Sequence, residues 1–268
     1  MDFSVFRNKY IITGELEVMT ALHIGSGKEE DGKDSPFINV NGELYIPGSS
    51  FRGYLRTKLE RLLTKENGFI FENKATGEEL NEGDVLLLFG YTNLNKEEKD
   101  TEEEKRRLMK VERIRKYFKI KDSKEKPADS LAGRIHISDM KHLTIGKTIT
   151  RDGIKIDRNT GATEKGAKFD YDVIPAGARF SFCMELENVE KYQLELIGLA
   201  LKDMIEEGDL FGGKLSRGIG KCRLIKDELK MNYIEADNKE DLKEYIFNKT
   251  MKVTTAKNIF EVKNLNLK

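Results

Sequence analysis

Residues 212–221, Gly-Gly-Lys-Leu-Ser-Arg-Gly-Ile-Gly-Lys, have the composition of a loop that holds phosphate. Four glycines in the first nine positions allow positive φ angles and a close approach to another backbone. The other polar positions are three cations and one hydroxyl: Lys214, Ser216, Arg217 and Lys221. Such groups bind phosphate oxygens. The loop is predicted to run from helix to strand, the reverse of a Walker or Rossmann loop, and a tight surface turn with solvated cations is an equal alternative.

A second set of anion-binding groups begins a predicted helix. Pro47-Gly48 ends the preceding strand, and Ser49 and Ser50 are both N-cap candidates. One face of the helix that follows carries Phe51, Leu55, Leu59 and Leu62. The free N–H groups, the two hydroxyls and Arg52, with Arg56 one turn on, would converge where an anion binds. Taken alone, an ordinary capped amphipathic helix with solvated arginines is the simpler interpretation.

The composition limits the class of protein. The chain has 268 residues, enough for one large domain or two small ones. Its 47 basic and 47 acidic residues balance, so a surface that binds a polyanion must come from local segregation of charge. Cys183 and Cys222 fall in predicted strands as core thiols, and with three histidines they give no metal-ligand spacing. Without a signal peptide or a long apolar stretch, we expect a soluble, cytoplasmic protein with no membrane partner.

Hydrophobic patterns predict a mixed order of strands and helices. The predicted strands are 12–18, a hairpin of 37–40 and 44–46 around Asn41-Gly42, then 134–139, 180–186 and 221–225. A basic hairpin with a turn at Asp152-Gly153 is expected to project from residues 146–172. A second buried helix carries Leu194, Ile197, Leu201 and Met204 and is capped by Gly208. Residues 95–126 alternate in charge as a solvated, partly helical insertion does, and 226–268 allow no firm assignment.

Without the insertion, the order of elements is β-α-β-β-α-β. This order predicts an α+β fold with a single ferredoxin-like palm, the plan shared by RNA-recognition domains. The predicted segments are palm 1–63, a charged lid insertion 64–133, palm 134–145, a thumb hairpin 146–172, palm with the glycine-rich loop 173–230 and a C-terminal extension 231–268.

Six motifs stand in order along the chain. They are residues 22–27 (LHIGSG), 34–36 (DSP), 45–53 (YIPGSSFRG), 88–90 (LFG), 170–177 (DYDVIPAG) and 212–218 (GGKLSRG). Together they resemble the RAMP superfamily, and specifically the repeated backbone subunit of type III CRISPR effector complexes. The resemblance covers residues 10 to 225, with the insertion and the C-terminal extension poorly matched.

The resemblance implies a subunit that polymerises with further copies of itself along a CRISPR RNA, beside other Cas subunits. The thumb would displace one guide nucleotide at a regular interval, and a loop aspartate would cleave the target single-stranded RNA opposite each displaced position. Asp34 matches that aspartate because it directly precedes Ser-Pro and the hairpin, and Asp31 is the competing candidate. A turn residue that caps its own backbone is the other explanation of Asp34.

The chemistry follows from the properties of RNA. Its 2′-hydroxyl is the nucleophile, provided that the nucleotide is held so that attack on phosphorus is in line. Such positioning lowers the barrier by about 7–11 kcal/mol at best. The carboxylate would act as a base toward the hydroxyl or as a ligand of Mg2+ or Mn2+, with RNA phosphates completing the coordination of the metal. The sequence leaves both roles open.

The residues expected to hold the guide come from several regions: His23, Ser49, Ser50, Arg52, Arg56, Thr148, Arg151, Arg158, Lys214, Ser216, Arg217 and Lys221. They would contact the RNA backbone, because a guide-holding protein must accept any spacer sequence. His23 would stack or contact phosphate, and a packed histidine is an equal alternative.

Three other functions fit parts of the sequence. A non-catalytic RAMP subunit would hold the guide and never cut. A guide-processing RAMP endoribonuclease would rely on histidine, and neither His136 nor His142 has a convincing partner. A nucleotide-binding metabolic enzyme with a ferredoxin-like fold would need a second acidic cluster for Mg2+ beside the glycine-rich loop, and none is evident.

Overall fold

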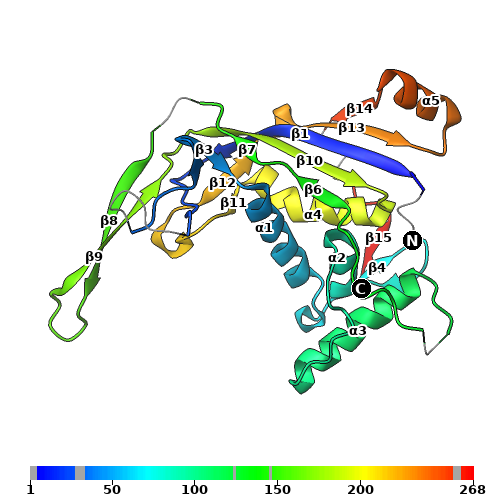
Figure 1. The fold of residues 1–268 in the computed structure, drawn as a ribbon, viewed down its shortest axis with the longest axis horizontal. Helices are drawn as coiled ribbons and strands as arrows, with labels where there is room; N and C mark the ends of the chain where they lie inside the picture. Colours follow the sequence, from blue (N-terminus) through cyan, green and yellow to red (C-terminus); the bar gives the residue numbers. More distant parts are fainter. Residues whose placement is uncertain (1–4, 28–33, 123–124, 145–146, 256–260) are drawn as a thin grey trace.

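The computed structural model describes residues 5–27, 34–122, 125–144, 147–255 and 261–268. Its fold is α+β, with helices packed on one face of an antiparallel sheet and a hairpin that projects from one end (Figure 1). Among these residues, no helix combines the length and the apolar character that crossing a lipid bilayer requires.

The main sheet is built around strand β1 (Asn8–Val18). One edge of β1 pairs with β10 (Arg179–Glu187), and β10 pairs in turn with β6 (Ile135–Ile137). Burial alternates along β1 and β10, as expected for strands with one face against a core. Cys222, which lies in the strand that follows the glycine-rich loop, is buried, whereas Cys183 in β10 is partly exposed. Only one of the two predicted core thiols is therefore in the core.

Both strands that follow the glycine-rich loop pair with the opposite edge of β1. β12 (Lys221–Leu224) pairs with the C-terminal end of β1, and β13 (Lys230–Glu235) pairs with its N-terminal half. β11 (Asp209–Leu210) and β14 (Lys252–Thr255) extend the sheet beyond them. The loose alternation of charged and apolar residues after 226 hides β13 from sequence analysis, although β13 is a long partner of the central strand.

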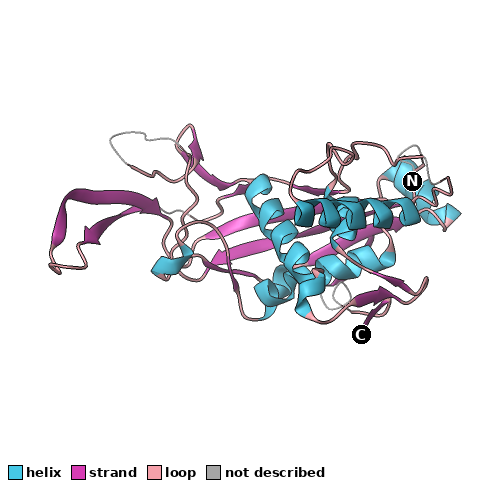
Figure 2. Cartoon of the chain, turned by 90° about the horizontal axis from the view of Figure 1, so that it is seen from below, coloured by secondary structure: helices cyan, strands magenta, loops and turns pink. Residues whose placement is uncertain are grey.

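Three helices cover the buried face: α1 (Gly48–Leu62), α2 (Glu82–Phe89) and α4 (Lys191–Glu206). Seen from below, these helices lie in front of the sheet (Figure 2). The Phe51 ring of α1 contacts the rings of Phe182 and Phe211, with centroids 5.4 Å apart in each pair. Helix α2 lies within the segment expected to form the lid. Its last five residues, 85–89, are nevertheless apolar and buried, and Val85, Leu88 and Phe89 belong to the main core.

The charged stretch forms helix α3 (Thr101–Tyr117), which a buried ion pair ties to the body. The Arg113 guanidinium donates hydrogen bonds of 2.8–3.0 Å to the Asp84 carboxylate of α2 and one of 2.6 Å to Glu78. The Tyr192 hydroxyl of α4 donates to the same Asp84 carboxylate at 3.0 Å. This part of the predicted lid is therefore anchored, and not simply a solvated face.

The remaining elements are short and lie around the main sheet. They are β2 (Asn39–Val40), β3 (Glu43–Ile46), β4 (Phe71–Asn73), β5 (Glu78–Glu79), β7 (Met140–Lys141), β15 (Leu265–Leu267), α5 (Lys239–Asn248) and the single turns η1 (Lys65–Asn67), η2 (Leu215–Arg217) and η3 (Lys226–Glu228). Asn41 and Gly42 turn the β2–β3 hairpin as predicted, with φ angles of 53° and 82°.

The projecting hairpin consists of β8 (Ile149–Ile156) and β9 (Thr163–Val173). The turn predicted at Asp152-Gly153 is wrong, because these residues lie inside β8. A Cβ atom at Gly153 would lie 2.2 Å from the Phe169 ring opposite, so the glycine makes room for that ring. The actual turn follows Asp157. Its carboxylate accepts hydrogen bonds from the Asn159 N–H at 2.7 Å and the Thr160 N–H at 3.2 Å.

Candidate nucleic-acid interface

The glycine-rich loop packs against the segment that follows β1. The Gly213 N–H donates to the His23 carbonyl at 2.8 Å, and the Gly220 N–H donates to the Ala21 carbonyl at 2.7 Å. Gly212 has a φ of 95°, and a Cβ atom there would lie 2.7 Å from the His23 oxygen. This contact therefore requires glycine. The loop starts from β11, a short strand that intervenes between the loop and the helix predicted to precede it.

Two cations of the loop lie over aromatic rings at the base of the projecting hairpin. The Lys214 Nζ atom is 4.9 Å from the Tyr171 ring centroid, and the Arg217 Cζ atom is 4.7 Å from the Phe169 ring centroid. Both rings belong to β9. Cation–π contacts of this kind hold a charged group in place through the ring face, which leaves its N–H donors able to bind a phosphate.

His23 is buried between the loop and the hairpin, and both of its ring nitrogens have protein partners. Nδ1 lies 2.6 Å from the Asp172 carbonyl oxygen, and Nε2 lies 3.1 Å from the Ser35 hydroxyl. A neutral ring that donates from Nδ1 and accepts at Nε2 satisfies both contacts. Burial lowers the pKa of His23, the hydrogen bond to Asp172 opposes this shift, and the charge of Lys214 reinforces it. Of the two roles expected for His23, the packed histidine agrees with this geometry.

The buried, neutral His23 predicts a pH-dependent stability. Because its pKa is lower in the folded than in the unfolded state, the unfolded chain binds more protons below the ordinary value of 6.5. The contribution of neutral His23 to the free energy of unfolding is fully present above pH 6.5. It is lost as the pH falls through 6.5 toward the folded-state pKa. Denaturant unfolding at about pH 7.5 and about pH 5.5 measures the loss. We expect a smaller loss for His23→Gln than for the wild type, and equal losses would contradict the assignment.

Asp34 is hydrogen-bonded to β9, along the edge of this strand that does not pair with β8. Its N–H donates to Asp170 Oδ1, and the Asp170 N–H donates to Asp34 Oδ2, both at 2.9 Å. The Asp172 N–H donates to the Ser35 carbonyl at 3.0 Å. Asp31, the competing candidate, lies outside the described residues.

Residues from four distant parts of the chain therefore meet around β9. We call this group the hairpin-base cluster: His23, Asp34, Ser35, Phe169, Asp170, Tyr171, Asp172, Lys214 and Arg217. The sequence analysis assigned a role to four of its members, His23, Asp34, Lys214 and Arg217. It included Ser35 and residues 170–172 only as parts of family motifs, and Phe169 lay outside every motif. The signal that could have indicated a role for residues 169–172 is their alternation of aromatic and acidic types, which puts the two kinds of side chain on opposite faces of a strand.

Neither serine at the start of α1 caps the helix, so the predicted N-caps are wrong. The N-cap is Pro47, which makes no side-chain cap bond. The Gly48 N–H instead donates to the Asp139 carboxylate at 2.8 Å. The helix begins before Ser49 and Ser50 because an acceptor from a distant strand connection already satisfies its first N–H group.

Arg52 and Arg56 have protein partners of their own. The Arg52 guanidinium donates to the Phe89 carbonyl at the end of α2 and lies over the Phe89 ring, 5.3 Å from its centroid. Burial lowers the pKa of Arg52, and the charge of Arg56 adds to this effect. Arg56 pairs with Glu60 at 2.9 Å. Arg52 therefore belongs to the packing between α1 and α2, whereas Arg56 is partly exposed and pairs within α1.

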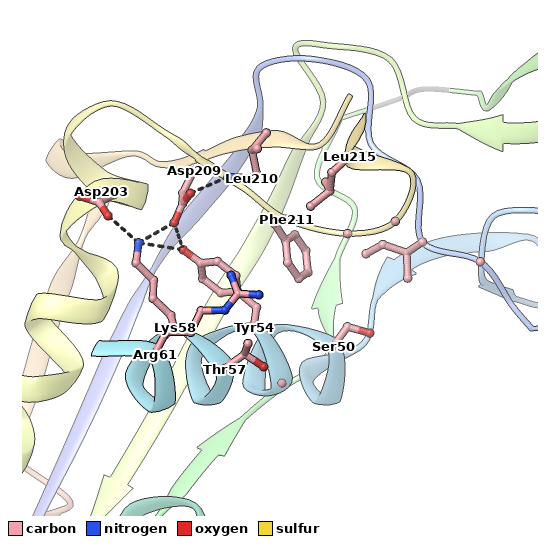
Figure 3. Close-up of a pocket in the computed structure, with 15 residues that line it drawn as sticks. Ser50, Tyr54, Thr57, Lys58, Arg61, Asp203, Asp209, Leu210, Phe211 and Leu215 are labelled. Carbon is pink, nitrogen blue, oxygen red and sulfur yellow. Dashed lines mark hydrogen bonds and ion pairs between the residues drawn. The ribbon is translucent and has the colours of Figure 1, made fainter. Parts of the chain in front are cut away.

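Ser50 lines a cavity of about 710 Å³ between α1 and the glycine-rich loop (Figure 3). Within it, the Lys58 ammonium contacts Asp203 at 2.7 Å and Asp209 at 2.5 Å. The Tyr54 hydroxyl donates to Asp209 at 2.6 Å. These groups satisfy one another, and they hold the start of β11, and hence the loop, against α1.

The other predicted RNA-binding residues are spread along the hairpin and the loop. Arg151 lies opposite Tyr171 in the β8–β9 register, and Thr148 immediately precedes β8. Arg158 is exposed in the turn at the far end of the hairpin. Ser216 is exposed in η2, whereas the Lys221 side chain passes beside Gly208. The structure thus brings Arg151 near the hairpin-base cluster and leaves Arg158 at the tip.

Comparison with known proteins supplies independent information. The model of the RAMP superfamily matches residues 15–223. A protein of Methanocaldococcus jannaschii is 28% identical over 230 residues, which cover 83% of this chain and 81% of that protein. A protein of Enterococcus italicus is 26% identical over 235 residues, covering 83% and 92%. Both relatives are named CRISPR system Cms endoribonuclease Csm3.

Proposed function

The chain belongs to the RAMP superfamily, and from this premise we propose that it is a guide-RNA-binding backbone subunit of a type III CRISPR complex that also cleaves target RNA. The observation that carries the proposal is the hairpin-base cluster. It joins the Asp34 carboxylate to one edge of β9 and the cations Lys214 and Arg217 to the aromatic face of the same strand. The names of both relatives agree with the activity.

In this proposal the palm is ferredoxin-like and consists of β1, α1, β6, β10, α4 and β12. The sheet order β12-β1-β10-β6 and the intervening helices support it. Segments 64–133 and 146–172 are insertions into the palm, and 231–268 is an extension of it. The subunit polymerises along the guide with copies of itself and with other Cas subunits, in the cytoplasm.

Guide and target are assigned to different groups of the cluster. Lys214 and Arg217 bind guide phosphates, with Ser216, Ser50 and Arg151 extending the contact. Asp34 acts on the target strand, where a 2′-hydroxyl attacks the adjacent phosphorus. The O2′–P bond forms as the P–O5′ bond breaks, and the products are a cyclic phosphate and a 5′-hydroxyl that takes up a proton.

Asp34 has two chemically consistent roles in this step. It would accept the proton of the 2′-hydroxyl, or it would hold Mg2+ or Mn2+, which would supply positive charge for the reacting phosphate. The Asp34 carboxylate offers the hard oxygen donors that such ions prefer. The described residues contain no group of three or more metal-ligating side chains here, so RNA phosphates and water would supply the remaining ligands. Cleavage in chelator separates the two roles.

The experiment that tests the function is cleavage by the assembled, guide-loaded complex. We expect a guide-complementary RNA to be cut at regularly spaced sites and a non-complementary RNA of equal length to stay intact. Binding of the complementary RNA without any cut supports the non-catalytic alternative. A single cut in the guide precursor, with intact target, supports the guide-processing alternative.

The cations of the cluster give a separate prediction. Lys214→Ala and Arg217→Ala should each weaken guide binding equally for any guide sequence, because they contact phosphate. Each should also reduce the slope of log K against log[salt] by about 1. Filter binding at several salt concentrations measures this, with Arg106→Ala on α3 as the matched control. An unchanged slope for both variants would refute the phosphate contacts.

A further inference from the structure

Asp170 belongs to the hairpin-base cluster and has no role in the function proposed above. It lies in β9, between the two aromatic residues that meet the loop cations. Its carboxylate accepts the Asp34 N–H, and its own N–H is donated to the Asp34 carboxylate, both at 2.9 Å. The first contact fixes the backbone of Asp34, and the second fixes the rotation of its side chain.

The neighbouring carboxylates make different contacts. Asp172 accepts a hydrogen bond from the Thr150 hydroxyl at 2.7 Å, which holds the two strands of the hairpin together. Asp152 lies opposite Asp170 on β8 and forms an exposed ion pair with Lys168 at 3.2 Å. Among the described acidic residues of the hairpin, only Asp170 bonds to Asp34 through its side chain.

The backbone continues the same connection. The Asp172 N–H donates to the Ser35 carbonyl, and the Ser35 hydroxyl meets the buried His23 ring. Residues 34–35 thus lie along the edge of β9 that does not pair with β8. A displacement of the hairpin base must therefore move Asp34 with it.

We infer that Asp170 is a positioning residue that fixes the Asp34 carboxylate for cleavage and makes its position follow that of the projecting hairpin. The inference rests on the proposed function, because it gives Asp34 the reactive role. Asp170 acts through hydrogen bonding, so an amide oxygen at this position can replace the carboxylate toward the Asp34 N–H.

The test compares Asp170→Ala, Asp170→Asn and Asp152→Ala in the guide-loaded complex. With saturating target, Asp170→Ala should lower the rate of cutting about 100-fold, as expected for a small misplacement of a reacting group. Target affinity should be unchanged. Asp170→Asn should retain most of the rate, and so should Asp152→Ala, the matched control on the opposite strand. The metal concentration for half-maximal rate should be the same in every variant.

Each other outcome overturns the inference. A rate for Asp170→Ala equal to that of the wild type shows that the contact is dispensable. Loss of cutting in Asp170→Asn, with a higher metal requirement, makes Asp170 a metal ligand instead of a positioning residue. Loss of target affinity in step with the rate makes the effect structural. Asp34→Ala, run in parallel, distinguishes the failures: if that variant cuts normally, the proposed role of Asp34 fails first.

Discussion

Asp34→Ala is expected to abolish regularly spaced cleavage while guide and target binding persist. Loss of a base or of a metal ligand at the reacting phosphate removes a factor of about 10²–10⁴ in rate. Binding should persist because the cations that hold the guide lie over the aromatic face of β9 and do not depend on the Asp34 carboxylate. Single-turnover cleavage and binding, measured on the same preparation, test the two parts separately.

Two further variants separate chemistry from packing at this position. Asp34→Asn keeps an oxygen that can accept the Asp170 N–H, so the loop should stay in place, yet its rate should fall as far as that of Asp34→Ala. Asp31→Ala should cut at the wild-type rate. If Asp31→Ala is inactive and Asp34→Ala is not, the reactive carboxylate is Asp31. If both variants cut normally, this chain is not the nuclease.

Arg113→Ala is expected to cause the largest loss of stability. Burial by itself lowers the pKa of Arg113. The hydrogen bonds and the charge of Asp84 outweigh this effect and raise the pKa above its usual value. Asp84 is fully buried, so removing the arginine leaves a carboxylate without a counter-charge. Breaking such a pair costs about 3–5 kcal/mol in the free energy of unfolding.

Denaturant unfolding measures this loss, and Arg106→Ala is the matched control. Arg106 is also an arginine of α3 with an ion-pair partner, Glu66, but both side chains are more than half exposed, at 52% and 74%. Exposed pairs contribute about 0–1 kcal/mol. Equal, small losses in both variants would mean that α3 is held by apolar contacts alone and that the buried pair carries no stability.

Short sequence patterns predict the elements whose conformation is decided by residues close together in the sequence. Burial alternates along β1 because one face meets the helices, and Asn41-Gly42 turns a hairpin because both residues tolerate positive φ. The failures occur where a distant residue decides. Asp152-Gly153 is a turn signal, yet Gly153 is needed under the ring of Phe169, and Ser49 and Ser50 lose the capping role to Asp139.

The candidate site is predictable in its residue types and not in its contacts. Glycines and cations at 212–217 indicate a phosphate-binding loop, and the family resemblance selects Asp34. Nothing local indicates that Lys214 and Arg217 rest on the rings of β9, or that Asp170 exchanges hydrogen bonds with Asp34. These contacts join residues more than 40 positions apart, and a single sequence carries no record of such pairs.

The pairing of β1 also determines when the protein can fold during synthesis. Its partners are residues 179–187, 222–224 and 230–235, all in the last third of the chain. At about 5–20 residues per second, the ribosome completes these partners about 10–40 s after it has made β1. Until residues 179–187 have been made, both edges of this 11-residue strand stay unpaired. We therefore expect the nascent chain to be most prone to aggregation before these strands emerge, because an unpaired strand edge can pair with another chain.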